Sequence, residues 1–203
     1  MKILIGCEYS GTIRDALIRG GHECVSCDFL PSETPGPHYQ GDVMDIIGDS
    51  WDGMIVHPEC TYLCVSGLHW NYNPKSPRFG GKQTEEALRF VQELFDKSQH
   101  IPRFALENPI SCISSRIKKP TQIIQPYQFG HDASKATCLW LRGLPKLVGT
   151  AYVPPRIVNG KKRWANQTDS GQNRLGPSDD RWKFRSKTYE GIADAIASQW
   201  FKE

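Results

Sequence analysis

Short apolar runs alternate with amphipathic helical patterns over about the first 140 residues of the chain. The predicted strands are the apolar runs at residues 2–6, 22–28, 51–58, 103–108 and 135–141. Helical periodicity covers residues 11–21 and 84–98 and returns in a closing helix at 188–201. Strand–helix alternation predicts an α/β domain around a mostly parallel sheet. Ligands of such sheets bind beyond the carboxyl ends of the strands, so residues just after each predicted strand become the candidates for function.

The charge of the chain is concentrated in one segment. Residues 151–187 carry nine Lys or Arg and three Asp, a net charge of +6, while the whole chain has +3 and the remainder therefore −3. We expect a core at residues 1–150, a basic polar insertion at 151–187 (hereafter the basic strip) and a helix at 188–203 that returns to the core. The strip predicts a polyanionic partner, and a solvated loop that merely keeps the protein soluble is the alternative.

The amino-terminal segment and the number of cysteines indicate in which cellular compartment the protein is expected. The first apolar run, Ile3–Cys7, is interrupted by Gly6 and is too short for a signal peptide or a membrane span. Seven cysteines form an odd and irregularly spaced set, which favours reduced thiols over a disulfide framework. We therefore expect a cytoplasmic protein with no membrane partner.

The segments after the first two predicted strands have features of a nucleoside site. Gly11 follows the first strand at the start of a helix, where the backbone can approach a ligand closely. Asp28 ends the second strand and is placed to accept hydrogen bonds from ribose hydroxyls, and Asp42 could reach an adenine amino group. The G-x-G-x-x-G pattern of dinucleotide binders is absent, and a turn or capping role for Asp28 is an equal alternative.

The two following strands end in more reactive groups. Cys60 follows a strand and the rigid Pro58, so its thiol is expected to project from the edge of the sheet. Glu107 ends the next strand and is expected to point into the same crevice. A thiolate and a protonated carboxyl that face one pocket suit attack on a heteroaromatic ring, with the carboxyl holding a ring nitrogen as negative charge develops.

These segments occur in an order that resembles a known family. The stretches "EYSG", "CD", "GDVMD", "HPECTYLCVSG", "LENP" and "RSKTYEGIADAIA" follow one another between Lys2 and Trp200. In this order they resemble the DNA (cytosine-5) methyltransferases, most closely their short, often phage-borne members with a reduced target-recognition region. The resemblance implies the Rossmann-like fold of the class I S-adenosylmethionine-dependent methyltransferases, with helices on both faces of the sheet, working on DNA in the cytoplasm of a bacterial or phage-infected cell.

The resemblance also implies roles for individual residues. Cys60 would add to C6 of cytosine and Glu107 would hold N3 and the exocyclic amine, after the base has left the helix stack. S-adenosylmethionine would be the cofactor, and the residues around it would be Tyr9, Ser10, Gly11, Asp28, Asp42 and Pro58. The residues facing DNA would be Ser66, Asn108, Lys135, Arg163 and Arg185. No metal is implied.

The chain departs from the family pattern at the nucleophile and in the recognition region. Glu59 stands directly before Cys60 where the family has proline, and its charge would disfavour the thiolate unless it points away or pairs with His57. Only the basic strip stands where the family has a sizeable DNA-reading domain. Trp164, Trp182 and Phe184 alternate there with basic residues, which favours phosphate contacts with base stacking, on single strands or with weak sequence specificity.

Three other interpretations remain open at this stage. The protein could modify a free pyrimidine nucleotide, or it could bind cofactor and nucleic acid without turnover, alone or with a separate specificity partner. A structural zinc site is the third, because Cys24, Cys27, His57, Cys60 and Cys64 have short spacings, but four converging ligands would be needed. Small core residues are the more common role for such cysteines.

Overall fold

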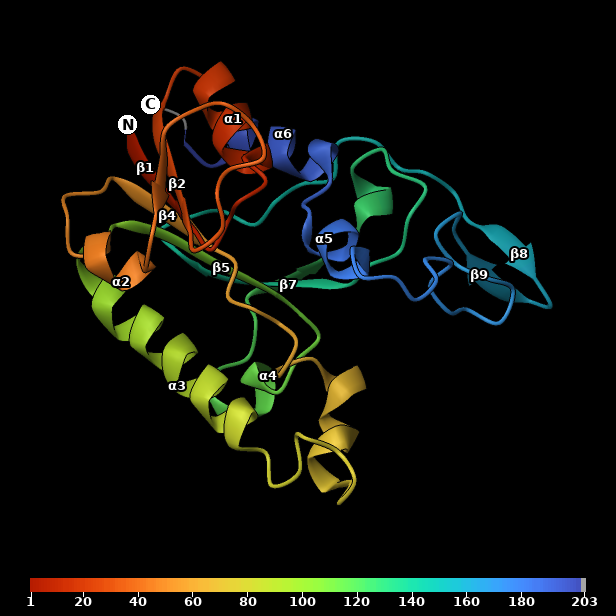
Figure 1. Cartoon of the computed structure of the whole chain (residues 1–203). Coiled ribbons are helices and arrows are strands. Elements are labelled where there is room, and N and C mark those ends of the chain that lie inside the picture. The colour runs from red at the N-terminus through yellow and green to blue at the C-terminus, as the bar shows by residue number, and fades with distance from the viewer. Residues whose placement is uncertain (202–203) are drawn as a thin grey trace.

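The computed structural model describes residues 1–201, which fold around a seven-stranded sheet (Figure 1). The strand order is β3-β2-β1-β4-β5-β7-β6. The strands are β1 (Lys2–Gly6), β2 (Glu23–Asp28), β3 (His38–Gln40), β4 (Gly53–Val56), β5 (Arg103–Pro109), β6 (Gln122–Ile124) and β7 (Thr137–Arg142). This architecture confirms the predicted α/β class and is compatible with a Rossmann-like fold.

The first five strands and β6 run in one direction, and β7 runs opposite to them. β1 lies between β2 and β4, both parallel to it, and β5 continues the parallel array beside β4. β7 pairs antiparallel with both β5 and β6. The chain order reverses between β1 and β4, which makes this the switch point where open α/β sheets bind ligands.

Helices cover both faces of the sheet, as predicted. The apolar residues of α1 (Thr12–Arg19) and α6 (Glu190–Gln199) pack on one face, with Ile55 and Ala105 of the central strands in the same cluster. The other face packs against α3 (Lys82–Lys97), together with the short helices α2 (Val43–Ile46) and α4 (Ile113–Arg116). The sheet therefore has a core on each side, and its functional edge is where the strands end.

The short elements of the fold differ from those predicted from the sequence. β3 lies in a Pro- and Gly-rich stretch for which no strand was predicted. It pairs with the outer side of β2 over only three residues. In α3, Leu88, Val91 and Leu94 are buried, while Ala87 is only partly buried. Short 3₁₀ helices occur at Val65–Tyr72, Ser98–His100 and Pro126–Gln128.

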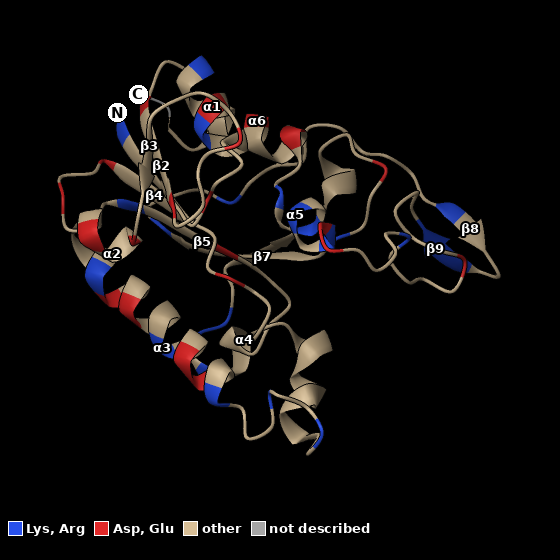
Figure 2. Cartoon of the chain, in the orientation of Figure 1, with Lys and Arg blue, Asp and Glu red and all other residues tan. Residues whose placement is uncertain are grey.

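The basic strip forms a hairpin and a short helix (Figure 2). β8 (Arg156–Val158) and β9 (Lys161–Arg163) pair across Asn159-Gly160, both with positive φ, as a tight hairpin turn requires. Helix α5 (Arg181–Ser186) follows and lies near α6 and β7 (Figure 1). The expectation that Trp164 offers a stacking surface is wrong. It is buried, stacked on Tyr127 with ring centroids 4.1 Å apart, while its indole NH donates to a backbone carbonyl.

The segment after the strip packs on the core. In α6, Ile192, Ala193, Ile196 and the following Trp200 are buried in the same cluster as Ile13 and Leu17 of α1. The last two residues of the segment expected at 188–203 lie outside the described residues. Among residues 1–201, no helix has the length and hydropathy needed to cross a membrane.

Candidate functional site

The site lies at the carboxyl ends of β1, β4 and β5, next to the switch point. The backbone NH of His57, one residue past β4, donates to the Gly6 carbonyl at the end of β1. β4 and β5 are aligned so that Val56 pairs with Leu106, which brings the next residues, His57 and Glu107, side by side. Parallel strands thus collect residues from distant parts of the chain at one edge, as the sequence predicted.

Glu107 forms a hydrogen-bonded pair with His57. The distance from His57 Nδ1 to Glu107 Oε2 is 3.1 Å, and the side chains are 14% and 21% exposed respectively. Burial works to raise the pKa of Glu107, but the hydrogen bond and charge of His57, with the charge of Lys135, outweigh it and hold this pKa below its ordinary value. Glu107 is therefore a carboxylate, whereas the sequence suggested a protonated carboxyl.

The Cys60 thiol is partly buried beside this pair. Burial, the Glu107 carboxylate and the Cys64 thiol raise its pKa, while Lys135 and Arg185 act in the opposite direction. The thiol form is thus favoured at neutral pH. Cys60 and Glu107, the two residues singled out from the sequence, therefore influence one another, and the carboxylate favours the protonated form of the thiol.

Replacing Glu107 by Gln should make Cys60 more reactive. The substitution removes a negative charge that raises the pKa of Cys60, so the thiolate fraction at neutral pH rises and alkylation of Cys60 by iodoacetamide becomes several-fold faster. The pH profile of the rate should move to lower pH. Peptide mass spectrometry resolves Cys60 from the other cysteines.

Glu85→Gln is the matched control for this substitution. Glu85 is an exposed carboxylate on α3 that is paired with Arg116. Glu85→Gln should leave the rate of Cys60 alkylation unchanged. If Cys60 is alkylated at an unchanged or slower rate in Glu107→Gln, the Glu107 carboxylate does not raise the pKa of the thiol.

Glu59 does not pair with His57, which was one of the two arrangements that the sequence left open. It is exposed, and the His57 ring that could have paired with it is bonded to Glu107. The charges that raise the pKa of Cys60 come first from Glu107 and then from Cys64. The neighbour in sequence is therefore less important to the thiol than the neighbour in the sheet.

A polar turn connects β1 to α1 at the same edge. Gly11 has φ +74°, and a Cβ there would clash with the Thr34 hydroxyl, so this position requires glycine. Tyr9 and Ser10 are buried, and the Tyr9 hydroxyl shares a 3.2 Å hydrogen bond with Ser186 at the end of α5. The turn predicted to bind cofactor therefore contacts the basic strip directly.

Glu8 was not identified from the sequence, although it controls this turn. Its carboxylate accepts hydrogen bonds from the backbone NH groups of Ile13 and Arg14 at 2.8 and 3.4 Å, and from the Ser10 hydroxyl at 3.3 Å. It therefore satisfies the otherwise unpaired amides of the first turn of α1. Because the acid precedes the helix by several residues, the usual capping spacing gives no signal for it.

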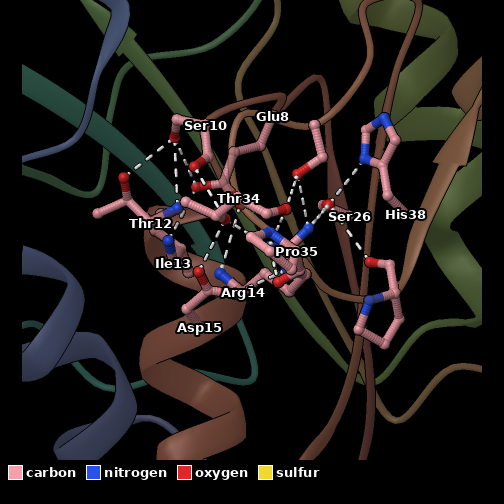
Figure 3. Close-up of polar contacts among 12 residues, drawn as sticks. Glu8, Ser10, Thr12, Ile13, Arg14, Asp15, Ser26, Thr34, Pro35 and His38 are labelled. Atoms are coloured by element: carbon pink, nitrogen blue, oxygen red, sulfur yellow. Dashed lines mark hydrogen bonds and ion pairs between the residues drawn. The ribbon is translucent and has the colours of Figure 1, made fainter.

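Arg14 is the centre of a second unpredicted network, drawn in Figure 3. Its side chain is 0% exposed. Nε donates to Asp15, Nη1 to the hydroxyls of Ser26 and Ser32, and Nη2 to Thr34 and the Pro35 carbonyl. These bonds tie α1 to β2 and to the loop after β2, and so fix the turn around Gly11.

Asp28 and Asp42 lie at the neighbouring strand ends. Asp28 Oδ1 accepts the Leu30 NH at 2.9 Å, and burial raises the pKa of this carboxyl against the opposing effect of that bond. Asp42 caps α2 by accepting the Met44 NH at 2.9 Å. Both also contribute to the raised pKa of Cys7, so the three side chains share one neighbourhood. Asp28 and Asp42 thus have the turn and capping roles that were the alternative, and both lie at strand ends next to the Gly11 turn.

The remaining predicted residues divide into two groups. Near the site, Asn108 donates from Nδ2 to the Pro58 carbonyl at 2.9 Å, and Lys135 Nζ donates to the Arg185 carbonyl at 2.7 Å. Ser66 is exposed and shares a 3.2 Å hydrogen bond with Cys64. Arg163 belongs to the β8–β9 hairpin, and its guanidinium donates within the basic strip, to the carbonyls of Asp169, Ser170 and Lys162.

The cysteines do not gather as a zinc site would require. Cys24 and Cys27 belong to the apolar clusters on opposite faces of the sheet, and His57 is bonded to Glu107. Within residues 1–201 no three His, Cys, Asp or Glu side chains are grouped to hold a metal ion.

Comparison with known proteins leaves the site to be interpreted from its geometry, because no protein-family model and no curated protein matches the chain.

Proposed function

We propose that the protein methylates C5 of cytosine in DNA, using S-adenosylmethionine and a transient covalent bond to Cys60. One observation carries the proposal: His57 and Glu107 are hydrogen-bonded at the switch point of the sheet, and Asn108 holds the segment that leads to Cys60 through the Pro58 carbonyl at the same edge. Lys135 and Arg185 add positive charge to the same point. A nucleophile, a carboxylate and cations around one crevice suit addition to an electron-poor ring.

In this reaction Cys60, Glu107 and His57 would each have a separate role. The Cys60 thiolate adds to C6 of an unstacked cytosine, and Glu107 accepts a hydrogen bond from the exocyclic amino group. His57, whose Nδ1 contacts Glu107, can pass a proton toward N3 through that carboxylate as negative charge develops on the ring. After the methyl group has reached C5, the C5 proton leaves to water, the N3 proton returns to the Glu107–His57 pair and the Cys60 sulfur departs as thiolate, which restores the aromatic ring.

The residues at the ends of β1 and β2 fit the cofactor in their chemistry. The half-buried Asp28 carboxyl suits ribose hydroxyls, and the exposed ring of Phe29 offers a surface for a flat base. Glu8, Asp28 and Asp42 make this edge acidic, which suits a cationic ligand. The cofactor would supply an electrophilic methyl group on a sulfonium.

The cavity beside the His57–Glu107 pair is too small for a base. The cavity lined by His57, Glu107 and Lys135 is about 20 Å³, room for about one water molecule and less than a pyrimidine ring. Thr188 and Tyr189 close it from the side of α6. A base that reaches Glu107 through this cavity is therefore expected to displace Thr188 and Tyr189.

The direct test combines methyl transfer and covalent trapping. The full chain, labelled S-adenosylmethionine and cytosine-containing DNA should give labelled DNA. An oligonucleotide containing 5-fluorocytosine should form a stable adduct that peptide mapping locates at Cys60, because fluorine at C5 cannot leave as a proton. Cofactor binding without any adduct or transfer would overturn the proposal.

A protein that binds the same ligands without turnover is the second candidate. The raised pKa of Cys60 favours it, since a thiol that stays protonated does not add to the ring. Binding of S-adenosylmethionine and DNA with no adduct, including at pH above 9 where more thiolate forms, would be the result expected of this alternative.

A further inference from the structure

Exposed aromatic side chains flank the site on two sides. The first group belongs to residues 65–80, between β4 and α3, named the aromatic arm here, and comprises Trp70, Tyr72 and Phe79. The second belongs to α5 and comprises Trp182 and Phe184. Tyr72 is 82% and Phe184 65% exposed, although aromatic rings are ordinarily among the more buried side chains.

Both groups are attached to the residues that surround the thiol. The aromatic arm begins just after Cys60, whose carbonyl accepts from the NH groups of Leu63 and Cys64, and Val65 bonds to Ile110 just beyond β5. α5 is held by the Lys135–Arg185 contact and by Tyr9, whose ring centroid is 5.9 Å from that of Trp182. Figure 1 shows the arm (yellow) and α5 (blue) on the same side of the molecule, beyond the central strands.

Basic residues accompany the aromatic ones. Arg181, Lys183 and Arg185 alternate with Trp182 and Phe184 along α5, and the exposed Lys75 lies in the arm. The β8–β9 hairpin adds the exposed Lys161 and Lys162 (Figure 2). Cations that follow a phosphate backbone, combined with rings on which bases stack, are the features of single-strand binding, since the bases of a duplex already stack on one another.

We propose that the substrate is single-stranded DNA, held by base stacking on the aromatic arm and on α5 so that an unpaired cytosine lies over Cys60. The inference rests on the proposed function only for the position of the reacting base. Binding of the strand depends on the two aromatic groups and can be measured without chemistry.

The test compares a labelled oligonucleotide with its own duplex by fluorescence anisotropy, using the full chain without cofactor at one fixed salt concentration. The single strand should bind at least about fivefold more tightly. Phe184→Ala and Tyr72→Ala should each weaken single-strand binding by about fivefold or more, because one stacked base is lost. Phe184→Tyr should retain the affinity and Phe184→Leu should lose it, since leucine keeps apolar area without a ring.

Val148→Ala is the matched control, because Val148 is an exposed apolar residue on another part of the surface, and it should bind like the wild type. Circular dichroism would confirm that all variants are folded. Duplex affinity equal to or above that of the single strand, or wild-type affinity in Phe184→Leu and Tyr72→Ala, would overturn the inference. Strand binding with these dependences but no methyl transfer would refute the proposed function alone.

Discussion

Cys60→Ser is expected to abolish methyl transfer and covalent trapping while leaving the affinity for S-adenosylmethionine unchanged. A serine hydroxyl is a much weaker nucleophile near neutral pH, and the neighbouring Glu107 carboxylate would disfavour its ionisation further. Because no other nucleophile is proposed to act on the ring, the rate should fall by at least about a thousandfold. Transfer of label to DNA measures the rate, and calorimetric titration measures cofactor affinity.

Cys64→Ser provides the control in the same segment. Cys64 is also only partly buried and lies one turn beyond Cys60, with its thiol bonded to Ser66. This variant should retain most of the activity, because the Cys64 thiol acts on Cys60 electrostatically and in the direction that raises its pKa, so its removal does not hinder thiolate formation. Substantial activity in Cys60→Ser, or equal loss in both variants, would mean that the reaction does not pass through Cys60.

The buried central strands could be predicted from the sequence, and the short strands at the edges of the sheet could not. β1, β4 and β5 are almost continuously apolar because both faces of the sheet are covered, and such runs identify central parallel strands. β3 and β6 are three-residue strands on the outer edges, with too few buried residues to produce a pattern. The antiparallel direction of β7 also left no signal, since side-chain alternation is the same in either direction.

The site was predictable to the extent that it depends on strand order. Cys60 and Glu107 could be assigned to one edge because residues that follow neighbouring parallel strands converge there. The His57–Glu107 bond required the register of β4 against β5, which the sequence does not state. The ionised state of Glu107 follows from that bond and was missed for the same reason.

Arg14 shows how a charged residue can belong to the core. A basic residue in an amphipathic helix is ordinarily assigned to solvent, yet Arg14 is enclosed by α1, β2 and the loop at residues 29–37. Its position three residues before the buried Leu17 places it on the inward face of α1, which is the one signal the sequence offers. Burial is tolerated because the guanidinium donors are matched by acceptors.

Arg14→Met should therefore be strongly destabilising although it replaces a charge by an apolar side chain of similar length. The hydroxyls and carbonyls that receive its hydrogen bonds would remain buried without their donor, and Asp15 would lose its partner. The free energy of unfolding should fall by about 3 kcal/mol or more. For a chain of this size that corresponds to a melting temperature lower by roughly 6–12 °C. Chemical denaturation and calorimetry measure the two quantities.

Arg19→Met on the same helix separates this effect from the loss of a positive charge. The Arg19 side chain is 66% exposed and pairs at 3.1 Å with the exposed Asp194 of α6, so its removal should cost less than about 1 kcal/mol. Amide hydrogen exchange in residues 29–37 should accelerate in Arg14→Met and stay unchanged in Arg19→Met. Since this loop holds Thr34 against Gly11, the affinity for S-adenosylmethionine should fall in Arg14→Met as well. Equal stability of the two variants would show that the buried network does not organise the turn.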